Sequence, residues 1–327
     1  MLPKLPTELL GRSSTSSNAL HRTDLKSPIS NLQFSIPVGA SEIGPRSPIA
    51  VKTSAGLRRL IVNADDFGGS SSINHAVIRA HREGILTTAS LMVNEPAFEE
   101  AVALAREDPK LGVGLHLTLL CGHSALPFEK IPGLVNPNRE FSNSPARVGF
   151  RYFFNRDLRE QLRAEIHAQF QKFHDTSLPM DHVNGHLHLH LHPTVFNILI
   201  EDAAQLGINC LRLTYDPFWL NLRLARGHFP YRALHAAIYF CLSRRARPFL
   251  VQRGIRHTKT VFGLLQNARV DESYITALLP HLPPGDSELY SHPSLDEFKN
   301  EFEALISSRV RAQIEKLGIK LIRYQDL

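Results

Sequence analysis

Two adjacent aspartates, Asp65 and Asp66, follow a short aliphatic run at 60–62 in the sequence NADDFG. Chemistry in parallel α/β folds takes place at the carboxyl ends of strands, so a strand over 60–62 would put both carboxylates at that edge. Adjacent strand residues point to opposite faces, and both can serve one site only if the chain turns, which the FGG sequence at 67–69 permits. Such a pair pushes its pKa values apart, which suits one ligand and one proton acceptor. A loop whose aspartates cap a helix is the alternative.

A single histidine, His116, lies within the alternating sequence GVGLHLTL at 112–119. Alternation places Gly114, His116 and Thr118 on one face of a strand and the aliphatic residues on the other. Taken alone, such a histidine is more often a core residue than a metal ligand.

The strongest signal is a run of five histidines at even positions in the sequence DHVNGHLHLHLHP at 181–193. A strand spanning all five would be about 33 Å long at about 3.3 Å per residue, so the five cannot share one ion. We predict that the strand ends at His186, which becomes a ligand, and that His188 and His190 contact the ligands or the substrate. Neutral imidazole is a common metal ligand. A structural or adventitious metal-binding cluster is the alternative.

A late histidine, His292, follows the strand-like sequence ELYS at 288–291 and precedes a proline. A barrel would return the end of this strand to the mouth that holds the aspartates. The His-Pro pair is weak by itself, but His292 supplies the general acid that the other residues lack.

The elements that must position these groups alternate along the chain from residue 57. The patterns predict strands at 60–62, 89–93, 113–119, 180–185, 209–214, 288–291 and 317–322. They predict helices at 73–83, 97–106, 157–174 and 194–206, the last capped by Thr194 and ended by Gly207. Alternation of strands and helices implies a mostly parallel sheet. We therefore predict an α/β fold: a single TIM-like (β/α) barrel over 57–327, either distorted or seven-stranded.

Composition sets the broad class of the protein. Hydrophobic residues make up 43% and charged residues 21% of the 327 residues, which is ordinary for a globular chain. The three cysteines form no CxxC pair, so neither a disulfide framework nor a zinc–thiolate site is indicated. No apolar run approaches the roughly 18 residues that cross a bilayer. Residues 1–56 are rich in Ser, Pro and Asn and are predicted to be a flexible, mostly disordered extension. We expect a soluble, cytoplasmic protein.

Positive charge is concentrated in one segment. Residues 217–270 contain ten Arg or Lys and no Asp or Glu, against a net charge of +6 for the whole chain. Within it, residues 217–256 are predicted to be a basic and apolar insertion that forms a lid or faces a membrane peripherally. An ordinary lid or helix pair with a solvated basic face is the alternative. No recognised motif supports nucleic-acid binding.

Together these motifs resemble the YdjC-like carbohydrate deacetylase family over nearly all of 58–327. The family pattern is a strand ending in NADDFG, a histidine in a glycine–hydrophobic–histidine–hydrophobic strand, a histidine-rich run before a proline, and a late His-Pro pair. Four further stretches resemble the branch associated with hopanoid biosynthesis, at 89–93, 149–154, 182–186 and 261–264. That branch is associated with deacetylation of an N-acetylglucosaminyl hopanoid lipid.

The resemblance implies a role for each matching residue. The implied metal ligands are Asp66, His116 and His186. The implied catalytic residues are the general base Asp65, the general acid His292 and the base-orienting Arg212.

Substrate binding is assigned to His188, His190 and Asn184. Asn184 departs from the family pattern, because many family members carry an aspartate at this position. If that aspartate orients His186, the support in this chain is neutral or comes from Asp181.

The predicted function is a metal-dependent N-deacetylase of an N-acetylated amino sugar, and the expected substrate is an N-acetylglucosaminyl hopanoid lipid. One divalent ion is the implied cofactor, with magnesium or zinc named first. An Asp-His-His set does not select decisively among zinc, magnesium, manganese and iron. The alternatives are another metal-dependent hydrolase on the same barrel, such as a phosphoesterase or amidohydrolase, and a non-catalytic metal- or lipid-binding protein. The expected partners are the amino sugar, lipid-linked or free, and a membrane surface; an oligomer is compatible with the sequence.

Overall fold

The computed structural model describes residues 56–225, 227–266 and 269–327. The extension predicted for 1–56 lies outside these ranges except for Gly56. The described residues form strands β1 Arg58–Phe67, β2 Thr88–Leu91, β3 Gly112–Leu117, β4 Met180–Gly185, β5 Thr260–Phe262, β6 Gly285–Ser291 and β7 Lys320–Leu321.

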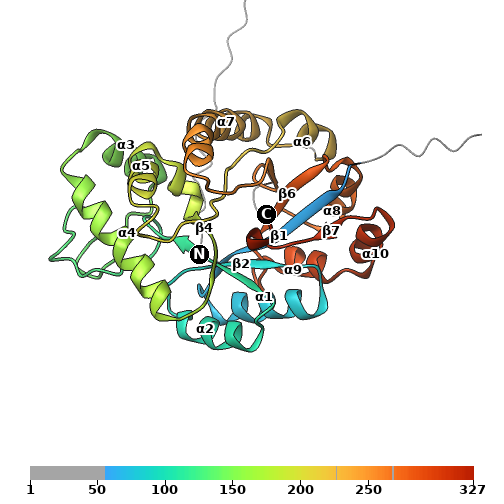
Figure 1. The fold of residues 1–327 in the computed structure, drawn as a ribbon, viewed down its shortest axis with the longest axis horizontal. Helices are drawn as coiled ribbons and strands as arrows, with labels where there is room; N and C mark the ends of the chain where they lie inside the picture. Colours follow the sequence, from blue (N-terminus) through green and yellow to red (C-terminus); the bar gives the residue numbers. More distant parts are fainter. Residues whose placement is uncertain (1–55, 226, 267–268) are drawn as a thin grey trace, which may run out of the picture. The chain divides into compact units, whose positions relative to one another are not determined.

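The strands make one curled parallel sheet at the centre of the fold (Figure 1). Their order is β4-β3-β2-β1-β6-β5, and β7 pairs with the beginning of β1. Two isolated parallel bridges, Val183 with Leu211 and Cys210 with Arg256, connect β4 to the chain that leads into β5. The predicted α/β fold is confirmed as a distorted TIM-like barrel, in which single bridges stand where a regular barrel has a continuous ladder.

Helices surround this sheet, with α1 and α2 below it and α6 and α7 above it in Figure 1. The α-helices are α1 Ser71–Glu83, α2 Phe98–Glu107, α3 Pro145–Phe154, α4 Leu158–Asp175, α5 Pro193–Glu201, α6 Phe218–Leu224, α7 Phe229–Gln252, α8 Glu272–Leu278, α9 Lys299–Ile306 and α10 Ser308–Lys316. Three short 3₁₀ segments are η1 His186–Leu191, η2 Leu279–His281 and η3 Tyr324–Asp326.

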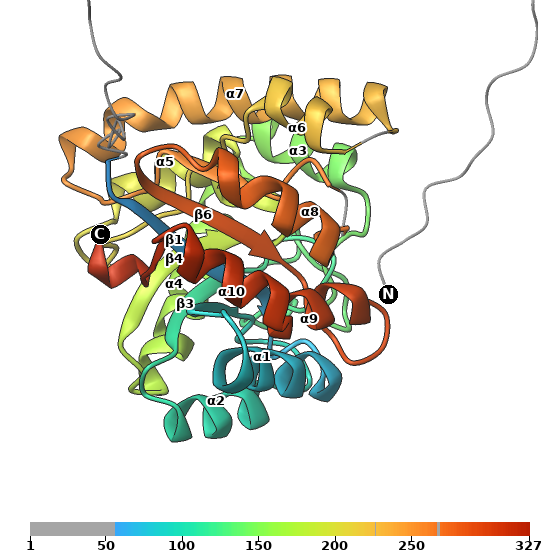
Figure 2. The same cartoon turned by 90° about the vertical axis from the view of Figure 1, so that its right-hand side faces the viewer.

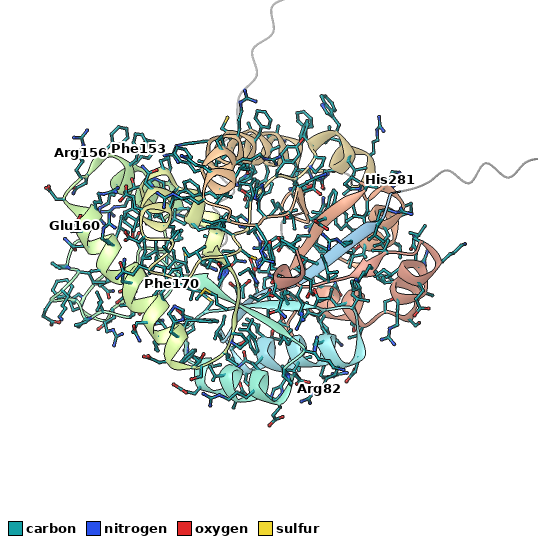
Figure 3. All side chains as sticks on the ribbon, viewed as in Figure 1. Arg82, Phe153, Arg156, Glu160, Phe170 and His281 are labelled. Atoms are coloured by element: carbon teal, nitrogen blue, oxygen red, sulfur yellow. The ribbon has the colours of Figure 1, made fainter. Side chains whose placement is uncertain are left out.

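The helix predicted over 157–174 is present as α4. Its residues Leu162, Ile166 and Phe170 are buried in the core because residues three and four apart share one face of a helix. Figure 3 shows Phe170 on this helix, within the molecule. The 24-residue α7, in contrast, lies in the segment predicted only as a basic and apolar insertion at 217–256.

Other boundaries differ from the prediction. The helix expected over 194–206 begins at Pro193 and ends at Glu201. Its cap is the ring of His192, which accepts a hydrogen bond from the Thr194 backbone, and not the Thr194 side chain. The strand expected at 209–214 is reduced to the two bridges. None of the described helices combines the length and the apolar character needed to span a bilayer.

Two glycines provide a paired test of the packing between β3 and β4. A Cβ added at Gly114 would lie 2.5 Å from both Nδ1 and the backbone oxygen of His182, whereas one added at Gly149 on α3 meets nothing within 4 Å. We expect Gly114→Ala to lower the free energy of unfolding by about 1–3 kcal/mol, since the His182 backbone must move. We expect Gly149→Ala to be neutral or to stabilise by up to about 1 kcal/mol, since alanine favours a helix.

Denaturant unfolding of the two variants measures both effects. Equal stability of Gly114→Ala and the unaltered chain would contradict the close approach of β4 to β3.

Candidate active site

The backbone of β1 leaves the extended conformation at Asp66. Its φ is 64°, and the pairing of β1 with β2 shifts register between Ala64 and Phe67. Aspartate tolerates this left-handed region better than most residues. The turn that lets both aspartates serve one site therefore begins at Asp66 and continues through the predicted 67–69, where Gly68 has a φ of 93° and the Gly69 N–H donates a 2.9 Å hydrogen bond to the Asp66 carbonyl.

Three side chains from three separate segments meet at this point. They are Asp66 from β1, His116 from β3 and His186, the first residue after β4. Asp66 Oδ1 lies 3.2 Å from His116 Nε2 and 3.0 Å from His186 Nδ1. One ligand atom from each residue lies within 4.8 Å of the others. The structure therefore brings together the three residues predicted to hold a metal.

The spacing of these atoms fits a coordinated cation. Ligand atoms about 2.1 Å from one ion, at angles of about 90–109°, lie roughly 3.0–3.4 Å apart. The two measured distances, 3.2 Å and 3.0 Å, match this range.

The electrostatics of the group also favour positive charge. Burial raises the pKa of Asp66, but the charge of His186 and the hydrogen bonds of both histidines bring that pKa well below its ordinary value. Burial lowers the pKa of His116, and the carboxylates of Asp65 and Asp66 outweigh burial and raise it. A bound divalent cation would replace the histidine protons as the positive charge that stabilises the Asp66 carboxylate.

Asn184 sets the orientation of His116. The two residues are register partners on β4 and β3, and Asn184 Oδ1 accepts a 2.7 Å hydrogen bond from His116 Nδ1. This bond puts the ring proton on Nδ1 and leaves the Nε2 lone pair directed at Asp66. Asn184 therefore contacts His116 rather than His186, and Asp181 contacts His182.

Asp65 is buried beside Asp66, His116 and His186 and carries a negative charge. Arg212 binds it with two hydrogen bonds, Nη1 to Oδ2 at 2.7 Å and Nη2 to Oδ1 at 3.0 Å. Asn63 and Asn184 each donate a further bond to Oδ1. Burial raises the pKa of Asp65, but the charge of Arg212 overcomes it and lowers that pKa well below the ordinary value. Asp65 is therefore ionised at neutral pH.

Arg212 is itself fully buried between two carboxylates. Its Nε donates a 2.9 Å hydrogen bond to Glu288 Oε1, and Glu288 also accepts a hydrogen bond from Tyr324. Because a buried guanidinium is costly unless it is paired, Glu288 and Tyr324 fix the position of the arginine that holds Asp65. The predicted contact of Arg212 with Asp65 is present in the structure.

His188 and His190, the next two histidines along the chain after His186, are both buried. His190 has 0% exposure, and its Nε2 donates a 3.0 Å hydrogen bond to the Arg212 backbone oxygen; burial lowers its pKa to about 3. Burial also lowers the pKa of His188, and the Arg212 charge adds to the effect. The His188 ring lies 5.3 Å from the rings of both Tyr239 and Tyr290. Both histidines are therefore neutral.

His292 stands at the end of β6, as predicted. Its Nε2 lies 2.9 Å from the Tyr290 hydroxyl, and its Nδ1 is buried without a hydrogen-bond partner among the described residues. The His292 charge is one of the influences that lower the pKa of Asp65. The structure therefore places His292 in the same electrostatic environment as Asp65.

Several residues of the site were not identified from the sequence. Six further residues contact the predicted ones directly or through one partner: Asn63, Ser90, Glu288, Tyr239, Tyr290 and Tyr324. Alternation along β6 puts Glu288 and Tyr290 on the face of His292, so two of them could have been found. Nothing in the local sequence marks Tyr239 or Tyr324.

Comparison with known proteins gives a consistent picture. The family model described as YdjC-like protein matches residues 59–316. A carbohydrate deacetylase of Geobacillus stearothermophilus is 32% identical over 271 residues, which cover 82% of this chain and 98% of the relative. A chitooligosaccharide deacetylase of Proteus mirabilis is 38% identical over 152 residues, covering 45% of this chain and 55% of the relative.

A solved structure supports the fold. The crystal structure of an Enterococcus faecalis protein named for cellobiose-phosphate cleavage superposes with a TM-score of 0.63 at 24% identity. It covers 83% of this chain and 98% of that protein. At this identity the similarity concerns the fold alone.

The chain is a distorted parallel α/β barrel that gathers aspartates and histidines at the carboxyl edge of its strands, the edge at which such barrels carry their active sites. The chain belongs to the YdjC-like protein family. The predicted resemblance to that family is confirmed, and the hopanoid-associated branch stays a prediction.

The link between Asn184 and His116 leads to a test of metal binding. We expect Asn184→Ala to weaken the affinity for Zn²⁺ by about 10- to 100-fold, since loss of a partner that orients a ligating histidine has effects of this size. Isothermal titration at constant pH measures the affinity. Asn209→Ala, which removes an exposed asparagine outside the site, is the control. An unchanged affinity in Asn184→Ala would show that Asn184 does not position the ligand.

Proposed function

We propose that the chain is a divalent-metal-dependent N-deacetylase, which hydrolyses the acetamide of an N-acetylated amino sugar to acetate and a free amine. The observation that carries this proposal is the convergence of Asp66, His116 and His186 beside the ionised, Arg212-bound Asp65. The names of the deacetylases to which the chain is similar support the same activity.

Asp66, His116 and His186 would hold the ion. A bound zinc or magnesium ion polarises the acetyl carbonyl and lowers the pKa of water. Three protein ligands leave coordination positions open, and the 17% exposure of the Asp66 side chain gives the site access to solvent.

Asp65 is the proposed proton acceptor. Its Oδ1 accepts three hydrogen bonds, from Asn63, Asn184 and Arg212. Its Oδ2 accepts one, from Arg212, among the described residues, so a lone pair of Oδ2 remains for a water proton. The lowered pKa makes Asp65 a weak base, which is sufficient for water whose own pKa is reduced.

His292 is the proposed proton donor. As water adds to the acetyl carbon and the C–N bond breaks, the leaving nitrogen requires a proton. The unpartnered Nδ1 of His292 is suited to deliver it. Asp65 and His292 then carry out opposite transfers, and the atoms balance as acetate plus amine.

The other histidines divide between support and substrate. His190 and Asn184 both have 0% exposure, so we now assign them to holding Arg212 and His116 in place of the predicted substrate contact. His188, next to Tyr239 and Tyr290, is the one we retain at the substrate, where aromatic rings can pack on a sugar.

We further propose that the amino sugar is carried by a hopanoid-type lipid and that the enzyme meets it at a membrane. The sequence stretches that resemble the hopanoid-associated branch support this finer assignment. The segment at 217–256, which contains α6 and α7, contributes Tyr239 to the group around His188.

Acetate release tests the proposed reaction. With metal present, we expect the unaltered chain to release acetate from N-acetylglucosaminyl substrates, soluble or lipid-linked, and Asp65→Asn to be slower by about 10²- to 10⁴-fold, the usual contribution of a general base. A chelator should abolish the activity, and added Zn²⁺ or Mg²⁺ should restore it. His186→Ala should lose both activity and metal binding, whereas Asp65→Asn should keep metal binding.

Asp175→Asn, at an exposed position at the end of α4, is the matched control and should behave as the unaltered chain. Phosphate release without acetate release in a broad substrate screen would contradict the proposal. Equal rates for Asp65→Asn and the unaltered chain would remove Asp65 from the mechanism.

A further inference from the structure

Exposed apolar side chains are concentrated on three helices. Of thirteen large hydrophobic residues that are exposed in the described parts of the chain, ten lie on α3, α6 and α7. They are Phe150, Phe153, Phe154, Trp219, Phe229, Leu234, Ile238, Phe240, Phe249 and Val251. Figure 3 shows Phe153 at the outer edge of α3. A cluster of this size on a folded protein marks an interaction surface.

The same three helices contain no acidic residue. Their sequences include seven arginines and no Asp or Glu, and four of these arginines are exposed: Arg147, Arg223, Arg244 and Arg247. We call the outward surface of α3, α6 and α7 the arginine–aromatic face. This face exposes large apolar side chains and arginines, and its three helices contain no negatively charged side chain.

The three helices lie on one side of the barrel. Both views place them along the same edge, with α7 and α6 above β6 in Figure 2. The helix α6 packs on α7, and both α3 and α7 pack against α5. Their exposed residues can therefore meet one extended partner.

This face is connected to the candidate active site through α7. Tyr239 lies with its ring 5.3 Å from His188, while the next residue, Phe240, is 49% exposed. The segment η1, which carries His188, packs against α7, and its Leu187 is 42% exposed. A partner bound to the face would lie next to the site.

We propose that the arginine–aromatic face docks on an anionic phospholipid bilayer. Aromatic and aliphatic side chains would enter the interface, and arginines would meet the phosphate headgroups. A second copy packed through the same face would bring arginines against arginines, which is unfavourable. The inference extends the proposed lipid-linked substrate to a defined surface, and it includes α3, which lies outside the basic segment 217–256.

Co-sedimentation of the full chain with vesicles tests the docking. The probes are phosphatidylcholine vesicles with and without phosphatidylglycerol. We expect binding to the anionic vesicles. Removal of one exposed side chain from each helix in the triple variant Phe154→Ser, Trp219→Ser and Leu234→Ser should weaken that binding by about ten-fold or more. The control is Leu57→Ser, which is 63% exposed and lies outside the face.

Charge is tested separately. Arg244→Glu with Arg247→Glu should reduce binding to anionic vesicles by about ten-fold, because each arginine near such a surface contributes attraction. The matched control, Arg311→Glu with Lys316→Glu, reverses two exposed charges on α10 and should bind as the unaltered chain.

The docking would be overturned if the unaltered chain did not bind anionic vesicles, or if the triple variant bound them as well as the unaltered chain. It would also be overturned if the triple variant differed from the unaltered chain in oligomeric state, on analytical ultracentrifugation, and not in vesicle binding. Acetate release from a soluble chitooligosaccharide, measured in parallel, should be unchanged in both variants. Vesicle binding without deacetylase activity would reject the proposed function and retain the docking. Deacetylase activity without vesicle binding would reject the docking and retain the proposed function.

Discussion

The site depends on one backbone constraint: two consecutive aspartates must both reach the interior of the barrel. A regular strand would send Asp65 and Asp66 to opposite faces. The left-handed conformation at Asp66, with φ of 64°, together with the register shift against β2, removes that conflict. Left-handed backbone costs about 1–2 kcal/mol for most residues, and strain of this kind persists where the surrounding contacts impose it. Here Asp66 contacts His116 and His186.

A continuous path of hydrogen bonds joins Tyr324 to His116, one of the three residues proposed to hold the ion. It runs from Tyr324 through Glu288, Arg212, Asp65 and Asn184 to His116. Within this path the Arg212 charge is offset by the carboxylates of Asp65 and Glu288. Asp66 lies beside His116, where this path ends, and beside His186. A bound cation is favoured between these three side chains. Each member has its partners, which suits a buried polar network that must keep a fixed geometry.

Much of this arrangement could be predicted from the sequence. The rule that parallel strands present their carboxyl ends together placed Asp65 and Asp66 at one edge of the sheet, whereas the ligand role of His116 came from the resemblance to the YdjC-like family. The histidine strand was predicted to end at His186, and β4 ends one residue earlier, at Gly185. Strand register, in contrast, is not visible in local sequence. Asn184 was therefore linked to His186, although its register partner is His116. The three-residue β5 and the contact of Tyr324 with Glu288, 36 positions away, left no local pattern to find.

Anomalous X-ray diffraction from crystals grown with Zn²⁺ tests whether Asp66, His116 and His186 bind one divalent ion together. We expect a single strong anomalous peak about 2.0–2.2 Å from one oxygen of Asp66, from Nε2 of His116 and from Nδ1 of His186. A peak at other histidines, with none between these three residues, would contradict this expectation.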